Sequence, residues 1–427
     1  MTLSNKSKFS GSCMTRRIIM VVVAMLLGTS GLAMAAGHGA AHHVAHHAER
    51  KAPPVTAEPL AQITVFGGRP APFALDARAA MLIDRSSGDV LYAYNQHERM
   101  EPASLAKMMT FYLTLEALKQ KRITLDTPIP ISKAAWRLSL NSSVSRMFLQ
   151  VGQNVPVKEL LYGLMVSSGN DAAVALSEYL AGSTQAFADL MNQKAKQLGL
   201  TETHFANPDG LPADGEYTTA DDMVKLGNAL LRDFPEATEY TSTKEFTFDK
   251  IRQRNFNTLL FYDARVNGLK TGHVDVAGYH LVASAESGKL KLISAVMGTP
   301  SMEKRRVETD KLLDWAFRTF TTVSPDWHKA VPAQLRVYKG NVNEVAIAPA
   351  NGTPYFTVGR GDENKMTLAA TLPSKWLVAP VAKGTQVGEL SVMIAGKPIS
   401  SVPLVTETAV TEGGLMHRMA DAIRLKL

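Results

Sequence analysis

The chain has 427 residues, of which 45% are hydrophobic and 20% charged, a balance typical of globular proteins and a length that allows two or more domains. The formal net charge is +7, but residues 1–35 hold four basic and no acidic residues, and without them 42 basic against 39 acidic residues leave +3. So small a charge excludes nucleic acid as an expected partner. The single cysteine, Cys13, lies in the same segment, so we expect neither disulfides nor a thiol nucleophile in the mature protein.

The N-terminus has the pattern of an export signal. Basic residues precede an apolar run at 18–27, and Ala33-Met34-Ala35 offers a small-x-small cleavage site, so we predict a signal peptide over 1–35. The run is about half as long as a bilayer span, which makes an uncleaved anchor the weaker interpretation. Residues 36–64 are rich in Ala and His and are typical of a flexible linker; the histidines have no acidic or cysteine ligands beside them, so we predict no metal site.

Residues 65–322 predict one α/β domain. The stretch 79–95, "AAMLIDRSSGDVLYAYN", has the pattern of a hairpin, and 279–297 predicts paired strands around a Glu-Ser-Gly turn. Helical periodicity between and after them predicts helices at 102–120, 156–167, 169–181, 184–198, 219–232 and 302–319. Strands at both ends of the domain with helices between them favour an antiparallel sheet.

The C-terminal part predicts two further units. Residues 325–411 consist of short alternating runs divided by Gly, Pro and Asn, a pattern typical of a small β-sandwich. Residues 412–427 predict an amphipathic helix whose apolar face would hold Leu415, Met416, Met419, Ala420, Ile423 and Leu427. Such a helix lies in a membrane interface or packs on its own domain, and we favour the membrane.

A candidate nucleophile opens the first predicted helix, where Ser104-Leu105-Ala106-Lys107 places a hydroxyl and an amine on one face. A serine hydroxyl needs a base to remove its proton, and a lysine can be that base only when burial or nearby cations keep it neutral. The spacing alone proves little, because Ser301-Met302-Glu303-Lys304 repeats it.

Two other motifs strengthen the hypothesis. Ser168-Gly169-Asn170 precedes a predicted helix, and Lys270-Thr271-Gly272, which occurs once, lies beside a predicted strand. The three motifs follow one another at intervals of about 60 and 100 residues, in the order found in penicillin-binding proteins and serine β-lactamases.

On these motifs the chain resembles the low-molecular-mass penicillin-binding proteins that act as D-alanyl-D-alanine carboxypeptidases, the serine peptidases of the S11 type. The resemblance extends through "NSSVSRMFLQVGQNVPVKELLYGLMVSSGNDA", "GLKTGHVDVAGYHLVASA" and "ISAVMGTPSMEKRRVETDKLLDWAFRTF". It implies an α/β (α+β) catalytic domain of the β-lactamase/transpeptidase-like type, a small all-β sandwich domain, a C-terminal amphipathic helix and no cofactor.

The resemblance also implies roles for the motif residues. Ser104 would attack the bond between two D-alanines while Lys107 accepts its proton, and water would hydrolyse the resulting acyl-enzyme. Ser168 would relay the proton to the leaving amine, and Asn170 would orient Lys107 and the substrate.

Further residues would hold the substrate. Lys270 and Thr271 would bind the terminal carboxylate, Gly272 would allow close approach, and the N–H groups of Ser104 and His273 would form an oxyanion hole. Arg305 matches a family arginine near the carboxylate site. We reject Ser301 and Lys304 as a second active site, because no oriented trio accompanies them.

Two stretches depart from the family pattern. Close relatives often have His-Gly-Leu where this chain has Asp209-Gly210-Leu211, and Asn-Arg-Asn-Gly where it has Asn255-Phe256-Asn257-Thr258. Neither stretch overlaps the three motifs, so we expect them to alter efficiency more than the type of reaction.

We therefore expect an exported, periplasmic enzyme that trims peptidoglycan stem peptides, contributes to cell wall biogenesis and cell shape, is acylated by β-lactams, and lies peripherally on the outer face of the inner membrane. A serine β-lactamase is the runner-up, disfavoured because residues 171–269 contain no Glu-x-x-x-Asn. A peptidoglycan DD-endopeptidase, which attacks the same kind of bond, stays open, and a non-catalytic envelope protein is the weakest alternative.

Overall fold

The structure, a computed structural model, describes residues 62–425. The expected signal peptide at 1–35 and almost all of the expected linker at 36–64 lie outside the described residues, as do residues 426 and 427.

A six-stranded antiparallel sheet forms the centre of the first domain, in the order β1-β3-β2-β10-β9-β8. Its strands are β1 (Thr64–Val65), β2 (Ala79–Asp84), β3 (Val90–Tyr94), β8 (Val266–Val274), β9 (Gly278–Ser287) and β10 (Leu290–Thr299). β2, from the N-terminal hairpin, pairs with β10, the last strand of this sheet in the chain, and the two lie in the middle of the sheet. This arrangement confirms the antiparallel sheet predicted from the two hairpins.

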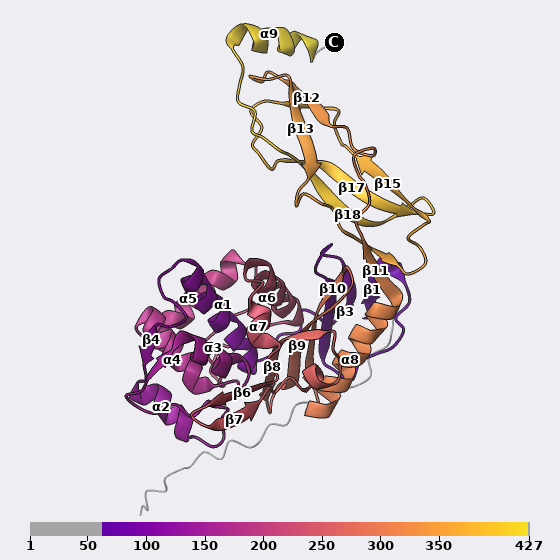
Figure 1. The fold of residues 1–427 in the computed structure, drawn as a ribbon. Coiled ribbons are helices and arrows are strands. Elements are labelled where there is room, and N and C mark those ends of the chain that lie inside the picture. The colour runs from indigo at the N-terminus through magenta and orange to yellow at the C-terminus, as the bar shows by residue number, and fades with distance from the viewer. Residues whose placement is uncertain (1–61, 426–427) are drawn as a thin grey trace, which may run out of the picture. The chain divides into compact units, whose positions relative to one another are not determined.

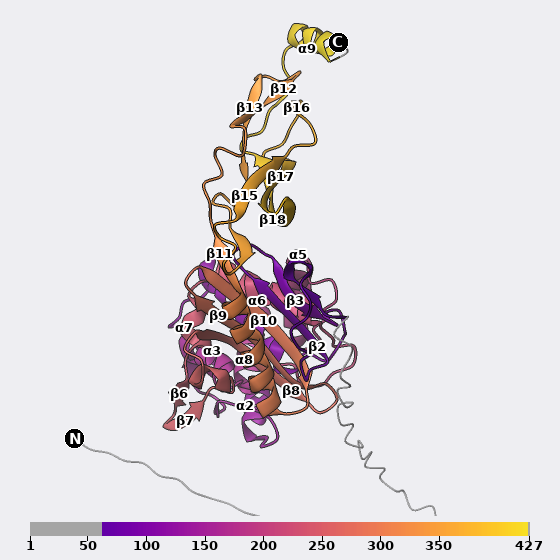
Figure 2. The ribbon, with the colours of Figure 1, turned by 90° about the vertical axis from the view of Figure 1, so that its right-hand side faces the viewer.

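Both faces of this sheet are covered. Met81 and Ile83 of β2 belong to the core on the helical side, whereas their neighbours Ala80 and Leu82 belong to the core under α8 (Met302–Thr319). Successive side chains of a strand point to opposite faces, so a strand buried on both faces reads as continuously apolar. α8 lies along one face of the sheet (Figure 2), and the other helices of the domain gather at its opposite side (Figure 1).

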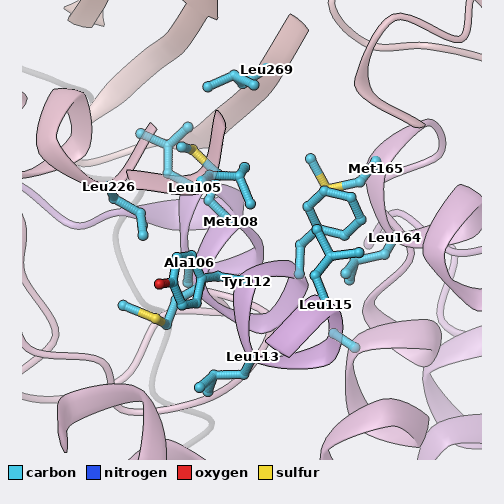
Figure 3. Packing of buried hydrophobic residues seen from close by; sticks show 14 of the residues in the cluster. Leu105, Ala106, Met108, Tyr112, Leu113, Leu115, Leu164, Met165, Leu226 and Leu269 are labelled. Carbon is cyan, nitrogen blue, oxygen red and sulfur yellow. The ribbon is translucent and has the colours of Figure 1, made fainter. Parts of the chain in front are cut away.

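The helical half is built around α1. Its helices are α1 (Lys107–Lys119), α2 (Lys133–Leu140), α3 (Val157–Met165), α4 (Asn170–Ala181), α5 (Thr184–Gln197), α6 (Ala220–Asp233) and α7 (Ala237–Thr241). Two small hairpins accompany them, β4 (Pro128–Pro130) with β5 (Asn154–Pro156) and β6 (Glu245–Phe248) with β7 (Ile251–Arg254). Leu105 and Met108 pack in one cluster with Leu164, Leu226 and Leu269, which come from α3, α6 and β8 (Figure 3). α1 is therefore held on several sides by the core.

The predicted helices agree with α1, α3, α4, α5, α6 and α8 to within a few residues. The main difference is at the start of α1, where Ala103–Ala106 form a 3-10 helix instead of the first turn of an α-helix. α2 and the five-residue α7 were not predicted, because each is too short for its periodicity to stand out.

The C-terminal domain is all-β, as predicted. Its main sheet has the order β15-β17-β18-β13-β12-β16 and is antiparallel except between β12 and β16. The strands are β12 (Gln334–Tyr338), β13 (Glu344–Pro349), β15 (Met366–Thr371), β16 (Trp376–Val378), β17 (Gln386–Ile394) and β18 (Lys397–Thr406), and β11 (Phe320–Val323) pairs with β14 (Phe356–Gly359). A separate apolar core supports it, and the helix α9 (Leu415–Arg424) follows. The expected domain boundary at 322–325 stays a prediction.

Candidate active site

Ser104 lies in the 3-10 helix directly before α1. The preceding residue, Ala103, has a φ of 50°, a left-handed conformation that costs a non-glycine residue about 1–3 kcal/mol. Gly210, with a φ of 74°, lies so close to the Ala103 carbonyl that a Cβ atom at position 210 would clash with it. The loop around Gly210 is thus pressed against the backbone that carries Ser104.

Lys107 is fully buried, and its Nζ has three oxygen neighbours: Ser104 Oγ at 2.9 Å, Asn170 Oδ1 at 2.7 Å and the Asp209 carbonyl at 2.5 Å. A neutral amine has two N–H groups for the amide and carbonyl oxygens and one lone pair for the Ser104 O–H. Burial lowers the pKa of Lys107 to about 8, against the opposing charges of Asp209, Asp171 and Glu216. The geometry therefore suits a base that removes the hydroxyl proton of Ser104.

Ser168, like Ala103, has a left-handed backbone conformation, with a φ of 53°. Its Oγ accepts a hydrogen bond of 3.0 Å from Lys270 Nζ, and its carbonyl accepts one of 2.7 Å from Ser145 Oγ. Asn170, the first residue of α4, donates from its amide to the Ser145 carbonyl at 3.0 Å while its oxygen contacts Lys107. The second motif is therefore joined to both lysines.

Lys270 is almost completely buried in β8, and its Nζ also donates to the Thr271 carbonyl at 3.1 Å. Burial lowers the pKa of Lys270 well below its usual value, and the positive charges of Lys107 and Arg305 lower it further. Its amine touches Ser168 and does not line the cavity described below. Lys270 is thus placed to act on Ser168 more directly than on a carboxylate in the cavity.

Gly272 lets β8 approach the segment that carries the nucleophile. A Cβ atom at position 272 would lie 3.0 Å from the Pro102 carbonyl and 3.3 Å from the Ala103 Cβ. The buried His280 of β9 reinforces this contact, because its Nε2 lies 3.2 Å from the Glu101 carbonyl while its Nδ1 accepts from the Gly298 N–H at 2.9 Å. The glycine was predicted for close approach to a substrate, and the structure adds this packing reason.

A cavity of about 690 Å³ joins the three motifs. Seven of the nine predicted site residues line it: Ser104, Ser168, Asn170, Thr271, Gly272, His273 and Arg305. The other two, Lys107 and Lys270, contact the hydroxyls of Ser104 and Ser168 from outside the cavity lining. All nine residues are therefore brought together.

Arg305 and His273 lie at one part of this cavity. Arg305 is 4% exposed, and its guanidinium donates to the carbonyls of Phe256 at 3.2 Å and Gly272 at 3.5 Å, while burial lowers its pKa to about 10. No ion pair joins it to a carboxylate among residues 62–425. His273 stacks on Tyr279 with 3.9 Å between ring centroids, and burial lowers its pKa.

The second Ser-x-x-Lys sequence has a structural role. Ser301 caps the N-terminus of α8, its Oγ accepting from the Lys304 N–H at 3.1 Å, and Lys304 Nζ pairs with Asp76 at 2.9 Å. The two side chains are therefore turned to separate partners, which agrees with their rejection.

Four contributors to the site were missed by the sequence reasoning: Ser145, Asp171, Glu216 and the carbonyl of Asp209. Asp171 is buried and accepts from four donors, the N–H groups of Met147, Leu149 and Ala172 and the Ser139 hydroxyl, at 2.7–3.2 Å. It thereby fixes the 147–149 backbone beside the site. Its position directly after the Ser-Gly-Asn motif was the available signal.

The two departures from the family pattern both reach the site. Asp209 contributes its carbonyl to Lys107, and Phe256 lines the cavity with its side chain 42% exposed.

Both domains of the chain match known protein families. Residues 67–301 match the family described as D-alanyl-D-alanine carboxypeptidase (peptidase S11), and residues 317–412 match the C-terminal domain of penicillin-binding protein 5. The D-alanyl-D-alanine carboxypeptidase DacC of Escherichia coli is 43% identical over 82% of this chain and 88% of its own length.

Solved structures extend the similarity to three dimensions. Penicillin-binding protein 5 from Haemophilus influenzae superposes with a TM-score of 0.73 at 39% identity, covering 80% of this chain and 99% of that one. Penicillin-binding protein D2 from Listeria monocytogenes, solved in an ampicillin-bound form, covers 57% of this chain and 98% of its own, with a TM-score of 0.52 at 33% identity. The chain therefore belongs to the peptidase S11 family of D-alanyl-D-alanine carboxypeptidases, and is a serine hydrolase with a C-terminal domain of the penicillin-binding protein 5 type.

Proposed function

We propose that this protein removes the terminal D-alanine of peptidoglycan stem peptides through an acyl-enzyme on Ser104. The observation that supports this proposal most directly is the surroundings of Lys107 Nζ. The Asn170 and Asp209 oxygens take the two N–H groups of a neutral amine, which leaves its lone pair for the Ser104 hydroxyl. Ser104 Oγ forms a bond to the carbonyl carbon, and its proton passes to Lys107. The C–N bond then breaks, and the amine of D-alanine leaves with a proton.

Ser168 completes the proton path. Its hydroxyl, held in place by Lys270 Nζ at 3.0 Å, passes its proton to the leaving amine and takes up in exchange the proton that Lys107 received from Ser104. Water then attacks the ester and gives a proton to the neutral Lys107; the bond between the acyl carbon and Ser104 Oγ breaks, Ser104 takes up that proton, and the shortened peptide leaves with a new carboxyl group. The backbone N–H groups of Ser104 and His273 stabilise the oxyanion formed in each step.

The proposal is tested with a synthetic pentapeptide ending in D-Ala-D-Ala and with a fluorescent penicillin. We expect one D-alanine per peptide and a covalent label on the peptide that contains Ser104. Rapid multiple turnover of the penicillin would favour the β-lactamase alternative. Faster cleavage of cross-linked dimers than of the monomeric pentapeptide would favour the endopeptidase.

Arg305 is proposed to bind the terminal carboxylate together with Thr271, since both line the cavity and, within residues 62–425, the guanidinium hydrogen-bonds to carbonyls and to no carboxylate. We expect Arg305→Gln to lower kcat/KM for the free-acid pentapeptide by about 10- to 100-fold, the usual value of a charge-assisted hydrogen bond. For a peptide amidated at its C-terminus, kcat/KM should fall little in this variant, because the amide offers no carboxylate to Arg305. The readout is the ratio of kcat/KM for the two peptides.

The neighbouring Arg306→Gln is the matched control, because Arg306 pairs with Glu303 at 2.6 Å on the same helix. If Arg305→Gln lowered kcat/KM equally for the free-acid and the amidated peptide, a carboxylate-binding role of Arg305 would be excluded.

α9 is proposed to lie in the surface of a membrane. Its apolar residues are turned outward, with Leu415 69%, Met416 81% and Ile423 63% exposed, while the fully buried Asp421 accepts from the Lys339 N–H at 2.7 Å. A helix packed only on its own domain would bury its apolar face instead. No helix among residues 62–425 is long and apolar enough to cross a bilayer, so this contact would be peripheral.

Replacing Leu415, Met416, Met419 and Ile423 together by serine keeps Asp421 and its contacts. We expect this variant to lose binding to vesicles with anionic lipid by more than about tenfold, since four large apolar side chains no longer enter the lipid. Co-sedimentation measures it, with Leu140→Ser, another exposed apolar residue, as the control. Unchanged co-sedimentation would mean that α9 is no anchor, as would unchanged fractionation after deletion of residues 412–427.

Export to the periplasm is part of the proposal. It is supported by the signal pattern of residues 1–35 and by the family, whose name gives a substrate located in the cell wall.

A further inference from the structure

Two acidic side chains lie close to Lys107 without reaching the cavity. Asp209 and Glu216 are 4% and 6% exposed, and neither lines the cavity that contains Ser104. The loop that carries them is fixed to the catalytic segment at two points, by the Asp209 carbonyl on Lys107 Nζ and by a 2.6 Å hydrogen bond from Thr110 Oγ1 to the Pro208 carbonyl. These carboxyls can therefore act on the reaction only through another residue.

Their hydrogen bonding differs from that of Asp171, the other carboxyl near Lys107. Asp171 accepts from four donors, the number that suits a full carboxylate. The carboxyl of Asp209 accepts from two backbone N–H groups, that of Leu211 at 3.1 Å and its own, and Glu216 accepts from the backbone of Ala206. Within the part of the chain that the structure describes, Glu216 Oε1 is buried without a hydrogen-bond partner. A charged, buried oxygen without a donor costs far more free energy than the same oxygen in a protonated, neutral carboxyl.

The charges of the surroundings lead to the same conclusion. Glu216 faces the carboxyls of Asp209 and Glu101 and the amine of Lys107, while Lys107 also faces Asp171 and Lys270. Burial raises the pKa of Glu216 to about 8, with a further contribution from the charge of Asp209, and burial raises the pKa of Asp209 as well. Two neighbouring carboxyls in such a site release their protons in two separate steps.

We propose that Asp209 and Glu216 share one proton near Lys107, and that the single negative charge left on the pair sets the basicity of Lys107. The inference rests on the proposed roles of Ser104 and Lys107. Both carboxyls are positioning residues, because they touch neither the substrate nor the reacting atoms.

This charge has a chemical use. Burial and the cation Lys270 disfavour the protonated amine, and an amine that binds a proton too weakly is a poor general base. One negative charge on the pair, added to that of Asp171, restores part of that affinity, whereas a second charge on the pair would hold Lys107 in its protonated, inactive form. A pair that shares one proton supplies one charge over a wide range of pH.

The test uses Asp209→Asn, Glu216→Gln and the double variant, all nearly isosteric. The measurement is the rate constant for acylation of Ser104 by a fluorescent penicillin between about pH 5 and pH 10, which rises with pH as Lys107 loses its proton. In either single variant the remaining carboxyl has lost its acidic neighbour and ionises, so one charge remains and the profile should move by less than about 0.3 pH unit. The double variant removes the charge of the pair and leaves only Asp171, so the rising limb should move about one pH unit lower, with a lower plateau.

Asp214→Asn is the matched control, because Asp214 is an exposed carboxylate of the same loop. Its profile should superpose on that of the wild type, and thermal melts of all variants report folding separately. Single variants that each account for half of the shift of the double variant would show two independent charges and overturn the proposal. So would a double variant whose profile superposes on the wild type. A wild-type protein that penicillin does not label would instead contradict the proposed function.

Discussion

A chain carrying Ser104→Ala is expected to release no D-alanine and to take up no fluorescent penicillin. The alanine removes the hydroxyl oxygen that lies 2.9 Å from Lys107 Nζ, while the Asn170 and Asp209 contacts of that amine stay in place. The site would therefore keep its shape and its ability to bind substrate, and only the covalent step would be lost. We expect a fall in kcat of at least about 10⁴-fold, as for other serine hydrolases without their nucleophile.

Ser301→Ala is the control for this change, because it removes a serine with the same spacing to a lysine. Ser301 caps α8 through the Lys304 N–H, so its loss should lower the stability by about 1 kcal/mol and leave acylation intact. D-alanine release and labelling of the Ser104→Ala protein at the wild-type rate would place the nucleophile elsewhere.

The sequence predicted the convergence of the motifs because each motif lies where an element begins or runs through the sheet. Ser104 precedes α1 and Asn170 opens α4, while Lys270 lies within β8. Helix starts and strands leave a periodic signal in the chain, so these positions could be assigned. Which element packs against which came from the family resemblance, since one sequence without it gives no order of strands.

The contacts that could not be predicted are those between loops and backbone atoms. The carbonyl of Asp209 reaches Lys107 across a separation of 102 residues, and a backbone carbonyl has no side chain by which a sequence pattern could mark it. The same holds for Lys270, whose amine touches Ser168, because direction within a strand is set by packing on both faces. Such contacts depend on the tertiary fold and have no local signature.

The burial of some polar side chains could not be predicted from the sequence either. Glu216 occurs in an Asp-Gly-Glu turn that reads as an exposed loop, yet it is buried, whereas its neighbour Asp214 is exposed. The backbone directly after Glu216 is paired with other segments, Tyr217 with His204 and Thr218 with Met100, whereas Asp214 lies outside these pairs.

Lys107→Met is expected to reduce acylation by about 10²- to 10⁴-fold, the usual contribution of a general base. Methionine fills a similar volume but has no lone pair that can take the Ser104 proton. In the wild type the rate should rise with pH through about 8, because only the unprotonated amine is active and burial lowers the pKa of Lys107 to that value. The variant should lose this rise along with the rate, measured as penicillin acylation against pH.

Lys107→Arg separates the base from the positive charge. A guanidinium stays protonated at every pH of the assay, so this variant keeps the cation beside Ser104 but cannot accept its proton. Lys119→Met, at the exposed end of the same helix, is the control and should behave as the wild type. If Lys107→Arg retained the wild-type rate, the lysine would act by charge alone and another group would have to take the proton. A loss equal to that of Lys107→Met would instead assign the proton transfer to the neutral amine, the form that the two acceptors and one hydroxyl around Nζ are arranged to hold.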